Sequence, residues 1–309
     1  MVHMFYRRRL LLALLESLNG EAHRKDFQKH VFLLTQGQSQ PAYDFIPYRL
    51  GCYSFTLESD RKALMRHGWL RNQPNWVLND NHLSNAHTLP SHSMLLTCDD
   101  QTTLALHTQQ WGACRGRQLI REVYIRYPSY ATRSEIAHEI LSKAELLKVQ
   151  ECKPAPLPGP ALFTIGYQGK SIEAYLQQLI NAQVDTLCDV RHNPTSRKVG
   201  FSGRQLRHVL NCLGIEYQHY PKLGIASVSR RHLQTSDNYQ QLFDNYHQTT
   251  LQSNTSDQDA IVQLLVQRNR VALTCFELEP HQCHRSCLAK AIKAKYKCLH
   301  TPLLIFDNL

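Results

Sequence analysis

The sequence lacks the long apolar segment of a membrane-spanning protein, because no run approaches the roughly 20 residues that cross a bilayer. Arg7-Arg8-Arg9 followed by six apolar residues imitates a signal peptide. Glu16 comes next without a small-residue cleavage site, which favours a helix of the folded protein. We therefore expect no membrane partner.

Two nucleotide-binding signatures are also missing. Neither a Walker A motif nor a full G-x-G-x-x-G fingerprint occurs, which argues against a P-loop NTPase and a dinucleotide enzyme. The ten cysteines show no paired spacing, and no secretory signal precedes them. Reduced thiols in a cytoplasmic protein are therefore expected.

Positive charge is abundant, and it is spread evenly along the chain. The 309 residues suggest two domains and carry a net charge of +10. Residues 1–150 hold 18 Lys/Arg against 13 Asp/Glu, and residues 151–309 hold 17 against 12, so each half is +5. This pattern favours nucleic acid as the partner, with double-stranded DNA as the preferred form. A basic surface that only aids solubility is the alternative.

The first half, residues 1–150, is expected to form a mainly helical domain with a winged-helix outline. Apolar periodicity predicts helices over residues 5–18, 22–35 and 57–67, a small hairpin around Trp76-Val77-Leu78 and a helical stretch over 117–149. Residues 151–160 follow as a linker, in which four prolines keep the chain extended.

Several segments of this half resemble a known domain. The segments are KHVFLL, YDFIPYRLGCYS, HGWL and LIREVYIRYPSYATRSEIA. Over about residues 8–135 they resemble the Panacea-type domain that accompanies toxin–antitoxin and phage-related genes. That family has Tyr-Gly-Pro-Tyr-Ser where this chain has Leu50-Gly51-Cys52-Tyr53-Ser54, so the proline is absent here. The resemblance implies a regulatory or defensive role against foreign DNA.

The second half, residues 161–309, alternates strand and helix patterns and is predicted to be an α/β domain with a Rossmann-like parallel sheet. The predicted strands are 162–167, 184–191, 215–220, 271–277 and 299–305. The predicted helices are 171–181, 203–213, about 237–269 and one that opens at Cys283, and a basic turn with Lys293, Lys295 and Lys297 precedes the last strand.

Three stretches of this half carry a second resemblance. FTIGYQGKSIEAYLQQL, LCDVRHNPTSRKVGFSGRQLRHVLNCLGIEYQHYPKLG and TCFELEPHQCHRSCLA are similar to the motifs of the family catalogued as domain of unknown function 488. The resemblance covers about residues 162–309 and implies a Rossmann-like fold with a pocket, but no established reaction. The family's defining positions correspond to Gly166, Asp189, Arg191, Pro194, Ser196, Tyr217, Leu223, Gly224, Cys275, Glu277, Cys283, His284 and Arg285.

A candidate site follows from polar residues at strand ends, where ligands bind in open α/β sheets. Asp189 ends one predicted strand and Glu277 another, and a pair of carboxylates suits hydrolysis of a glycosidic bond. The predicted catalytic residues are Asp189, Glu277, His284 and Cys283. The predicted substrate-binding residues are Gly166, Tyr167, Arg191, Ser196, Arg197, Tyr217 and Arg285. A structural ion pair is the alternative for Asp189 and Arg191.

The cysteines of the last motif allow three interpretations. Cys283 at a helix start beside His284 and Arg285 suits a nucleophile, whereas packing is equally open for it and is favoured for Cys275. Cys275, Cys283, His284 and Cys287 together suggest zinc ligands, but no C-x-x-C pair exists. We therefore expect no metal and no cofactor.

Two classes of function fit these features. The first is an enzyme that hydrolyses the N-glycosidic bond of modified DNA bases, with a nuclease as a weaker variant. The second is a non-catalytic module that senses a nucleotide or regulates DNA in the manner of an antitoxin.

Overall fold

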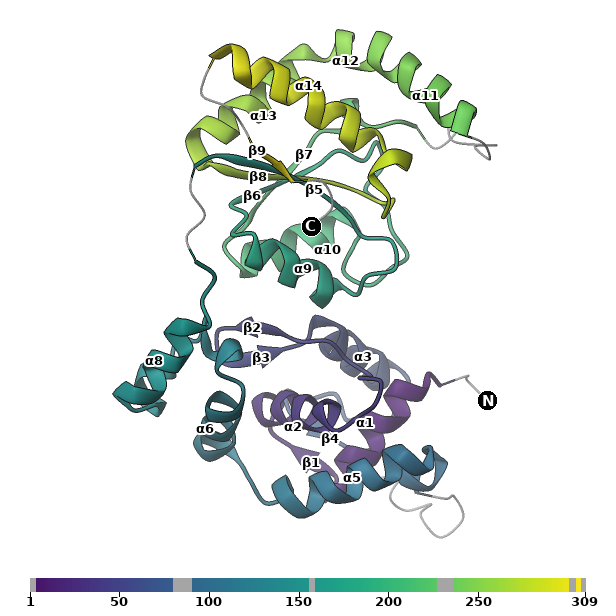
Figure 1. The fold of residues 1–309 in the computed structure, drawn as a ribbon. Helices are drawn as coiled ribbons and strands as arrows, with labels where there is room; N and C mark the ends of the chain where they lie inside the picture. Colours follow the sequence, from purple (N-terminus) through teal and green to yellow (C-terminus); the bar gives the residue numbers. More distant parts are fainter. Residues whose placement is uncertain (1–3, 80–90, 156–158, 227–235, 300–303, 307–309) are drawn as a thin grey trace. The chain divides into compact units, whose positions relative to one another are not determined.

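The structure is a computed structural model that describes residues 4–79, 91–155, 159–226, 236–299 and 304–306 (Figure 1). Internal contacts divide the chain into two compact units, residues 1–153 and 154–309. This division falls inside the predicted linker, 151–160. No helix in the described ranges is both long and apolar enough to cross a membrane.

The N-terminal unit begins with three helices and four short strands. These are α1 (Tyr6–Ser17), β1 (Glu21–Ala22), α2 (Arg24–Gln36), β2 (Ile46–Tyr48), β3 (Gly51–Tyr53), α3 (Phe55–Arg66) and β4 (Trp76–Val77). Antiparallel pairs join β1 to β4 and β2 to β3. The three helices lie where apolar periodicity predicts them, whereas the winged-helix and Panacea-type assignments stay predictions.

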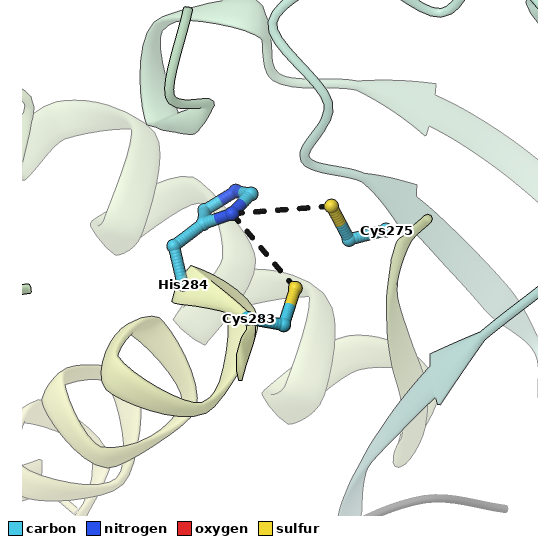
Figure 2. Close-up of side chains that lie close together, drawn as sticks. All are labelled: Cys275, Cys283 and His284. Atoms are coloured by element: carbon cyan, nitrogen blue, oxygen red, sulfur yellow. Dashed lines mark hydrogen bonds between the residues drawn. The ribbon is translucent and has the colours of Figure 1, made fainter. Parts of the chain in front are cut away.

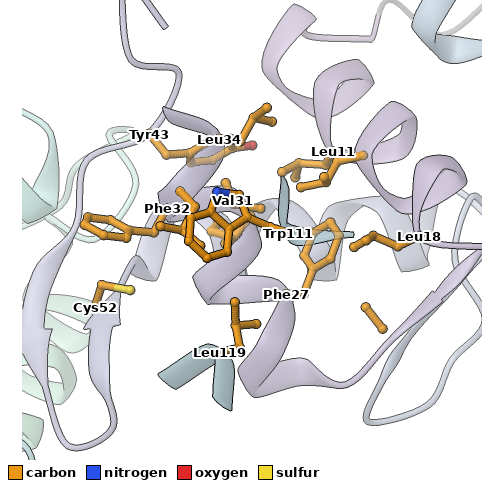
Figure 3. Close-up of a cluster of buried hydrophobic side chains, with 14 of the residues drawn as sticks. Leu11, Leu18, Phe27, Val31, Phe32, Leu34, Tyr43, Cys52, Trp111 and Leu119 are labelled. Carbon is orange, nitrogen blue, oxygen red and sulfur yellow. The ribbon is translucent and has the colours of Figure 1, made fainter. Parts of the chain in front are cut away.

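A single apolar core holds these helices together (Figure 3). All six residues of α1 from Leu10 to Leu15 are buried, so this part of the helix is surrounded by the core on every side. Phe27 of α2 stacks on Trp76 with ring centroids 4.1 Å apart. The side-chain oxygen of Ser54 accepts from the backbone N–H of Leu57 and so caps the start of α3.

The helical stretch predicted over 117–149 is wrong as one continuous element. The chain forms η1 (His92–Leu95), α5 (Cys98–Trp111), α6 (Gly116–Arg126), η2 (Pro128–Ala131), α7 (Ala137–Ile140) and α8 (Lys143–Glu151). Pro128 ends α6, because proline disfavours helical geometry at the preceding residue, and Tyr127 has φ −132° and ψ 67°. A capping box formed by Ser142 and Glu145 starts α8.

The C-terminal unit is a mixed α/β domain, which confirms the predicted Rossmann-like class. Its elements are β5 (Ala161–Gly166), α9 (Ile172–Asn181), β6 (Thr186–Asp189), α10 (Gly203–Cys212), β7 (Glu216–His219), η3 (Pro221–Leu223), α11 (Ser236–Gln248), α12 (Thr250–Ser253), α13 (Thr255–Arg268), β8 (Arg270–Cys275), η5 (Pro280–Gln282), α14 (His284–Leu299) and β9 (Leu304–Phe306). The five strands are parallel and lie in the order β7-β6-β8-β5-β9.

Helices cover both faces of this sheet, with α9 and α10 on one face and α13 and α14 on the other (Figure 1). Every residue of β5, β6 and β8 is buried, which explains their nearly continuous apolar sequences. Cys188, Val190 and Leu273 pack with the core of α13 and α14. Because side chains alternate along a strand, Asp189 and its register partner Thr274 point toward α9 and α10.

Two predicted boundaries in this unit are wrong. Strand β8 ends at Cys275, so Glu277 belongs to the following loop. Helix α14 continues to Leu299, where the last strand was predicted to begin, and β9 covers only 304–306. Lys293, Lys295 and Lys297 therefore lie on a helix, whose apolar side is buried at Leu288, Ala289, Ile292 and Tyr296.

Candidate functional site

Polar side chains gather at the carboxyl edge of the sheet, where open α/β folds bind ligands. They form two buried clusters, one on each face, and they border an open pocket. Each is built by the loop and helix that follow a strand.

The first cluster is an ion pair beneath α9 and α10. Arg191 Nε donates to Asp189 Oδ1 at 2.8 Å, a second guanidinium nitrogen donates to Oδ2, and both side chains are buried. Tyr217 of β7 donates to Asp189 Oδ2 at 2.7 Å. Burial lowers the pKa of Arg191, but hydrogen bonds and the charge of Asp189 outweigh it and raise this pKa above its ordinary value. This geometry is that of a structural ion pair, which was the alternative interpretation of Asp189 and Arg191 from the sequence.

The remaining contacts of Arg191 bind the neighbouring loops to this cluster. Its Nη1 donates to Tyr167 Oη and to the Phe201 carbonyl, each at 2.9 Å. Tyr167 stacks on Phe201 with ring centroids 4.4 Å apart. Tyr167 and Arg191, predicted to bind substrate, are therefore buried in contacts with the chain itself.

Gly166, predicted to bind substrate, has a steric role in this geometry. A Cβ atom at position 166 would lie 1.8 Å from the Glu277 carbonyl oxygen, far inside van der Waals contact. Glycine at the end of β5 thus lets the loop after β8 cross close above it.

The second cluster lies at the start of α14 and consists of Cys275, Cys283 and His284 (Figure 2). All three side chains are buried, and each sulfur lies 3.9 Å from His284 Nδ1. His284 Nε2 is 3.0 Å from the Val190 carbonyl oxygen. Since a carbonyl can only accept, Nε2 carries the proton and Nδ1 presents its lone pair to both thiols.

Cys283 is poorly suited to act as an unaided nucleophile. Burial, followed by the neighbouring Cys275 thiol and the charge of Glu277, raises the pKa of Cys283 well above its ordinary value. A raised pKa disfavours the thiolate, which is the reactive form of cysteine.

The two predicted catalytic carboxylates take part in different hydrogen-bonded clusters. Cys275 donates from its thiol to Glu277 Oε2 at 3.1 Å, which puts this carboxylate beside the cluster at α14. Asp189 lies on the opposite face of the sheet, held by Arg191 and Tyr217. Glycosidic hydrolysis needs two carboxyl groups on either side of one bond, so this arrangement does not favour it.

Arg285, predicted to bind substrate, holds the loop after β8 instead. Its guanidinium is buried and donates to the carbonyl oxygens of Glu277 and Leu278. Within the described residues it has no ion pair, and its Nε lacks a hydrogen-bond partner. Burial, followed by the charge of Arg285, lowers the pKa of nearby Lys170 to about 8.

An open pocket of about 430 Å³ lies between the loop after β6, the start of α10 and β7. Its lining residues are Pro194, Thr195, Ser202, Gly203, Arg204, Arg207, Tyr217 and His219. Arg207 lies over the Tyr217 ring, 5.1 Å from its centroid. The first turn of α10 contains no acidic residue, and no side chain caps it. A negatively charged group would thus meet guanidinium groups and the partial positive charge of a helix start.

Ser196 and Arg197 lie in the loop next to this pocket but do not line it. Ser196 Oγ accepts from the Lys198 backbone N–H at 3.2 Å, and Arg197 is exposed. Sequence reasoning missed Arg204, Arg207 and His219. The available signal was the spacing of two arginines three apart at a helix start, which places both on one face.

Comparison with known proteins finds one family match in the C-terminal unit. Residues 171–292 match the family described as Domain of unknown function DUF488, which confirms the predicted resemblance. No curated protein and no solved structure matches the chain.

Proposed function

We propose that this protein binds nucleic acid through the pocket on its C-terminal unit, as a non-catalytic sensing or regulatory module. The observation that supports the proposal is the cationic lining of the pocket between β6, α10 and β7, which includes no acidic residue among its described members. Double-stranded DNA is the preferred ligand, because net positive charge is present in both halves of the chain.

The arginines of the pocket are available to a ligand. Arg204 and Arg207 are exposed and form no ion pair within the described residues. Two arginines of the N-terminal unit are engaged instead, because Arg7 and Arg8 both pair with Asp60. Guanidinium groups that lack an acidic neighbour are suited to the bidentate binding of a phosphate.

The size and edges of the pocket also fit a nucleotide. Its volume lies in the range of small-molecule sites, and Thr195, Ser202 and His219 provide further hydrogen-bonding groups at its edge. The absence of disulfides among the nine described cysteines is consistent with a reducing cytoplasm, where we place the protein. A role in defence against foreign DNA stays a prediction that depends on the Panacea-type resemblance.

Fluorescence anisotropy with a labelled duplex tests the proposal. The Arg204→Ala/Arg207→Ala variant should bind at least about tenfold more weakly at low salt, since each charge-assisted contact contributes about 1.5–3 kcal/mol. The logarithm of the affinity should fall linearly with the logarithm of salt concentration, with a shallower slope for the variant.

Lys293→Ala/Lys297→Ala is the matched control, because it also removes two positive charges and both exposed lysines lie on α14, away from the pocket. It should leave duplex affinity nearly unchanged. Equal losses in both variants would mean that only diffuse charge binds DNA, and the pocket proposal would then be wrong. Release of a free base from modified DNA by the wild-type chain would instead support the hydrolase.

A further inference from the structure

We propose that Cys275, Cys283 and His284 bind one zinc ion in the C-terminal unit. This cluster is independent of the pocket at α10 and β7. The cluster lies on the other face of the sheet and shares no residue with that pocket. It is formed where β8 ends and α14 begins.

The spacing of the three ligand atoms fits tetrahedral zinc. The atoms all lie within 4.8 Å of one another, and each sulfur is 3.9 Å from His284 Nδ1. Zinc bonds of about 2.3 Å to sulfur and about 2.0 Å to nitrogen separate two such ligands by about 3.6 Å at the tetrahedral angle. Small rotations of the side chains suffice to close this difference. Figure 2 shows both sulfurs directed toward the same ring nitrogen.

The surroundings of His284 favour a ligand role. The hydrogen bond from Nε2 to the Val190 carbonyl fixes the ring and the tautomer, and metal-bound histidines usually donate their second nitrogen in this way. The Tyr246 ring meets the imidazole edge-to-face with centroids 5.4 Å apart, and Nδ1 stays directed toward the two sulfurs.

The charges around the cluster also balance with zinc present. Two thiolates neutralise the dication, and the charge of Glu277 beside Cys275 is opposed by the buried Arg285, which has no ion pair within the described residues. Buried charges are tolerated when they are paired or coordinate a metal. Three protein ligands would leave one position of a tetrahedral zinc ion for a further ligand.

Metal content of the full chain, purified under reducing conditions, is the first test. Mass spectrometry of the elements should find about one zinc per chain after weakly bound metal is removed by a mild chelator. Replacement by cobalt should produce a thiolate-to-cobalt charge-transfer absorption band.

Two variants assign the ligands. Cys283→Ser should lower zinc affinity at least tenfold and abolish the cobalt band. Cys287→Ser is the matched control, because Cys287 lies one turn further along α14 outside the cluster, and it should retain both. Circular dichroism checks that each variant is folded.

The wild-type measurement does not depend on any variant folding. A chain that takes up neither zinc nor cobalt would overturn the proposal, as would a disulfide between Cys275 and Cys283 in protein kept reduced. Equal loss of metal in Cys287→Ser and Cys283→Ser would also overturn it.

Discussion

The two faces of the C-terminal sheet bury polar groups in different ways. Under α9 and α10, Asp189 and Arg191 neutralise each other, and Tyr217 completes the hydrogen bonds of the carboxylate. At the start of α14, two thiols and an imidazole lie around one point, and no carboxylate–guanidinium pair joins them. The difference separates a charge-paired structural cluster from a cluster of side chains that can ligate a metal.

Removal of one charge from the charge-paired cluster should have the largest effect. Asp189→Asn leaves the buried Arg191 without its counter-charge, so the C-terminal unit should lose about 3–5 kcal/mol of stability. Hydrogen exchange at the amides of β6 and β8 measures this loss separately from the other unit. Asp259→Asn is the control, because the pair of Asp259 with Lys295 is partly exposed and contributes less than about 1 kcal/mol. A similar small change for Asp189→Asn would show that the cluster is not structural.

The N-terminal unit contains a third set of buried polar side chains, the histidines His30 and His107. They should make the stability of this unit depend on pH. Burial, followed by the charges of His107 and Arg115, lowers the pKa of His30 to about 3, and burial lowers that of His107 to about 4. The unfolded chain takes up protons near pH 6.5, whereas the folded chain does not, so stability should fall as pH drops through the window from 6.5 to about 4.

The expected loss in this unit is on the order of 2.5 kcal/mol for each histidine by about pH 4.5. Urea unfolding followed by tryptophan fluorescence measures it, because Trp69, Trp76 and Trp111 all lie in the N-terminal unit. His107→Leu should flatten the pH dependence, whereas the same change at the exposed His138 should not. An unchanged slope in His107→Leu would contradict the assignment.

The smallest effects on stability should come from removing single hydroxyl groups on the sheet face that contains Asp189 and Arg191. Tyr217→Phe removes a donor to the Asp189 carboxylate and should cost about 1.5–3 kcal/mol. Tyr175→Phe removes a 2.9 Å bond to the neutral Thr274 hydroxyl and should cost about 0.5–1.5 kcal/mol. Hydrogen exchange in β6 and β8 would compare the two, and a reversed order would argue against a charged Asp189.

Much of the fold could be predicted from local sequence patterns. The apolar runs of β5 and β6 and the periodic pattern of α9 identify a parallel sheet, and Asp189 and Arg191 two residues apart suggested a pair. These features depend on neighbours in the chain, so a single sequence contains them.

The arrangement of the site could not be predicted, because it depends on contacts between distant segments. The face of the sheet toward which Cys275 points depends on where β8 ends. It also depends on the position of β8 between β6 and β5 in the sheet. The pocket is lined by Arg204 of α10 and Tyr217 of β7, which belong to separate elements. A pairing of Asp189 with Glu277 looked reasonable from the sequence, but Asp189 binds Arg191 and Tyr217, whereas Glu277 lies in the loop after β8 and contacts Cys275.

The position of β5 has a consequence for how the chain folds during synthesis. It is made before every other strand of its sheet, yet its partners are β8 and β9, so Ala161 pairs with Arg270 and Leu304. Contacts this distant in sequence slow folding and leave both edges of an apolar strand exposed while the intervening chain is made. The N-terminal unit can complete its own core in that interval, and the nascent C-terminal unit is then the part that most needs protection from aggregation.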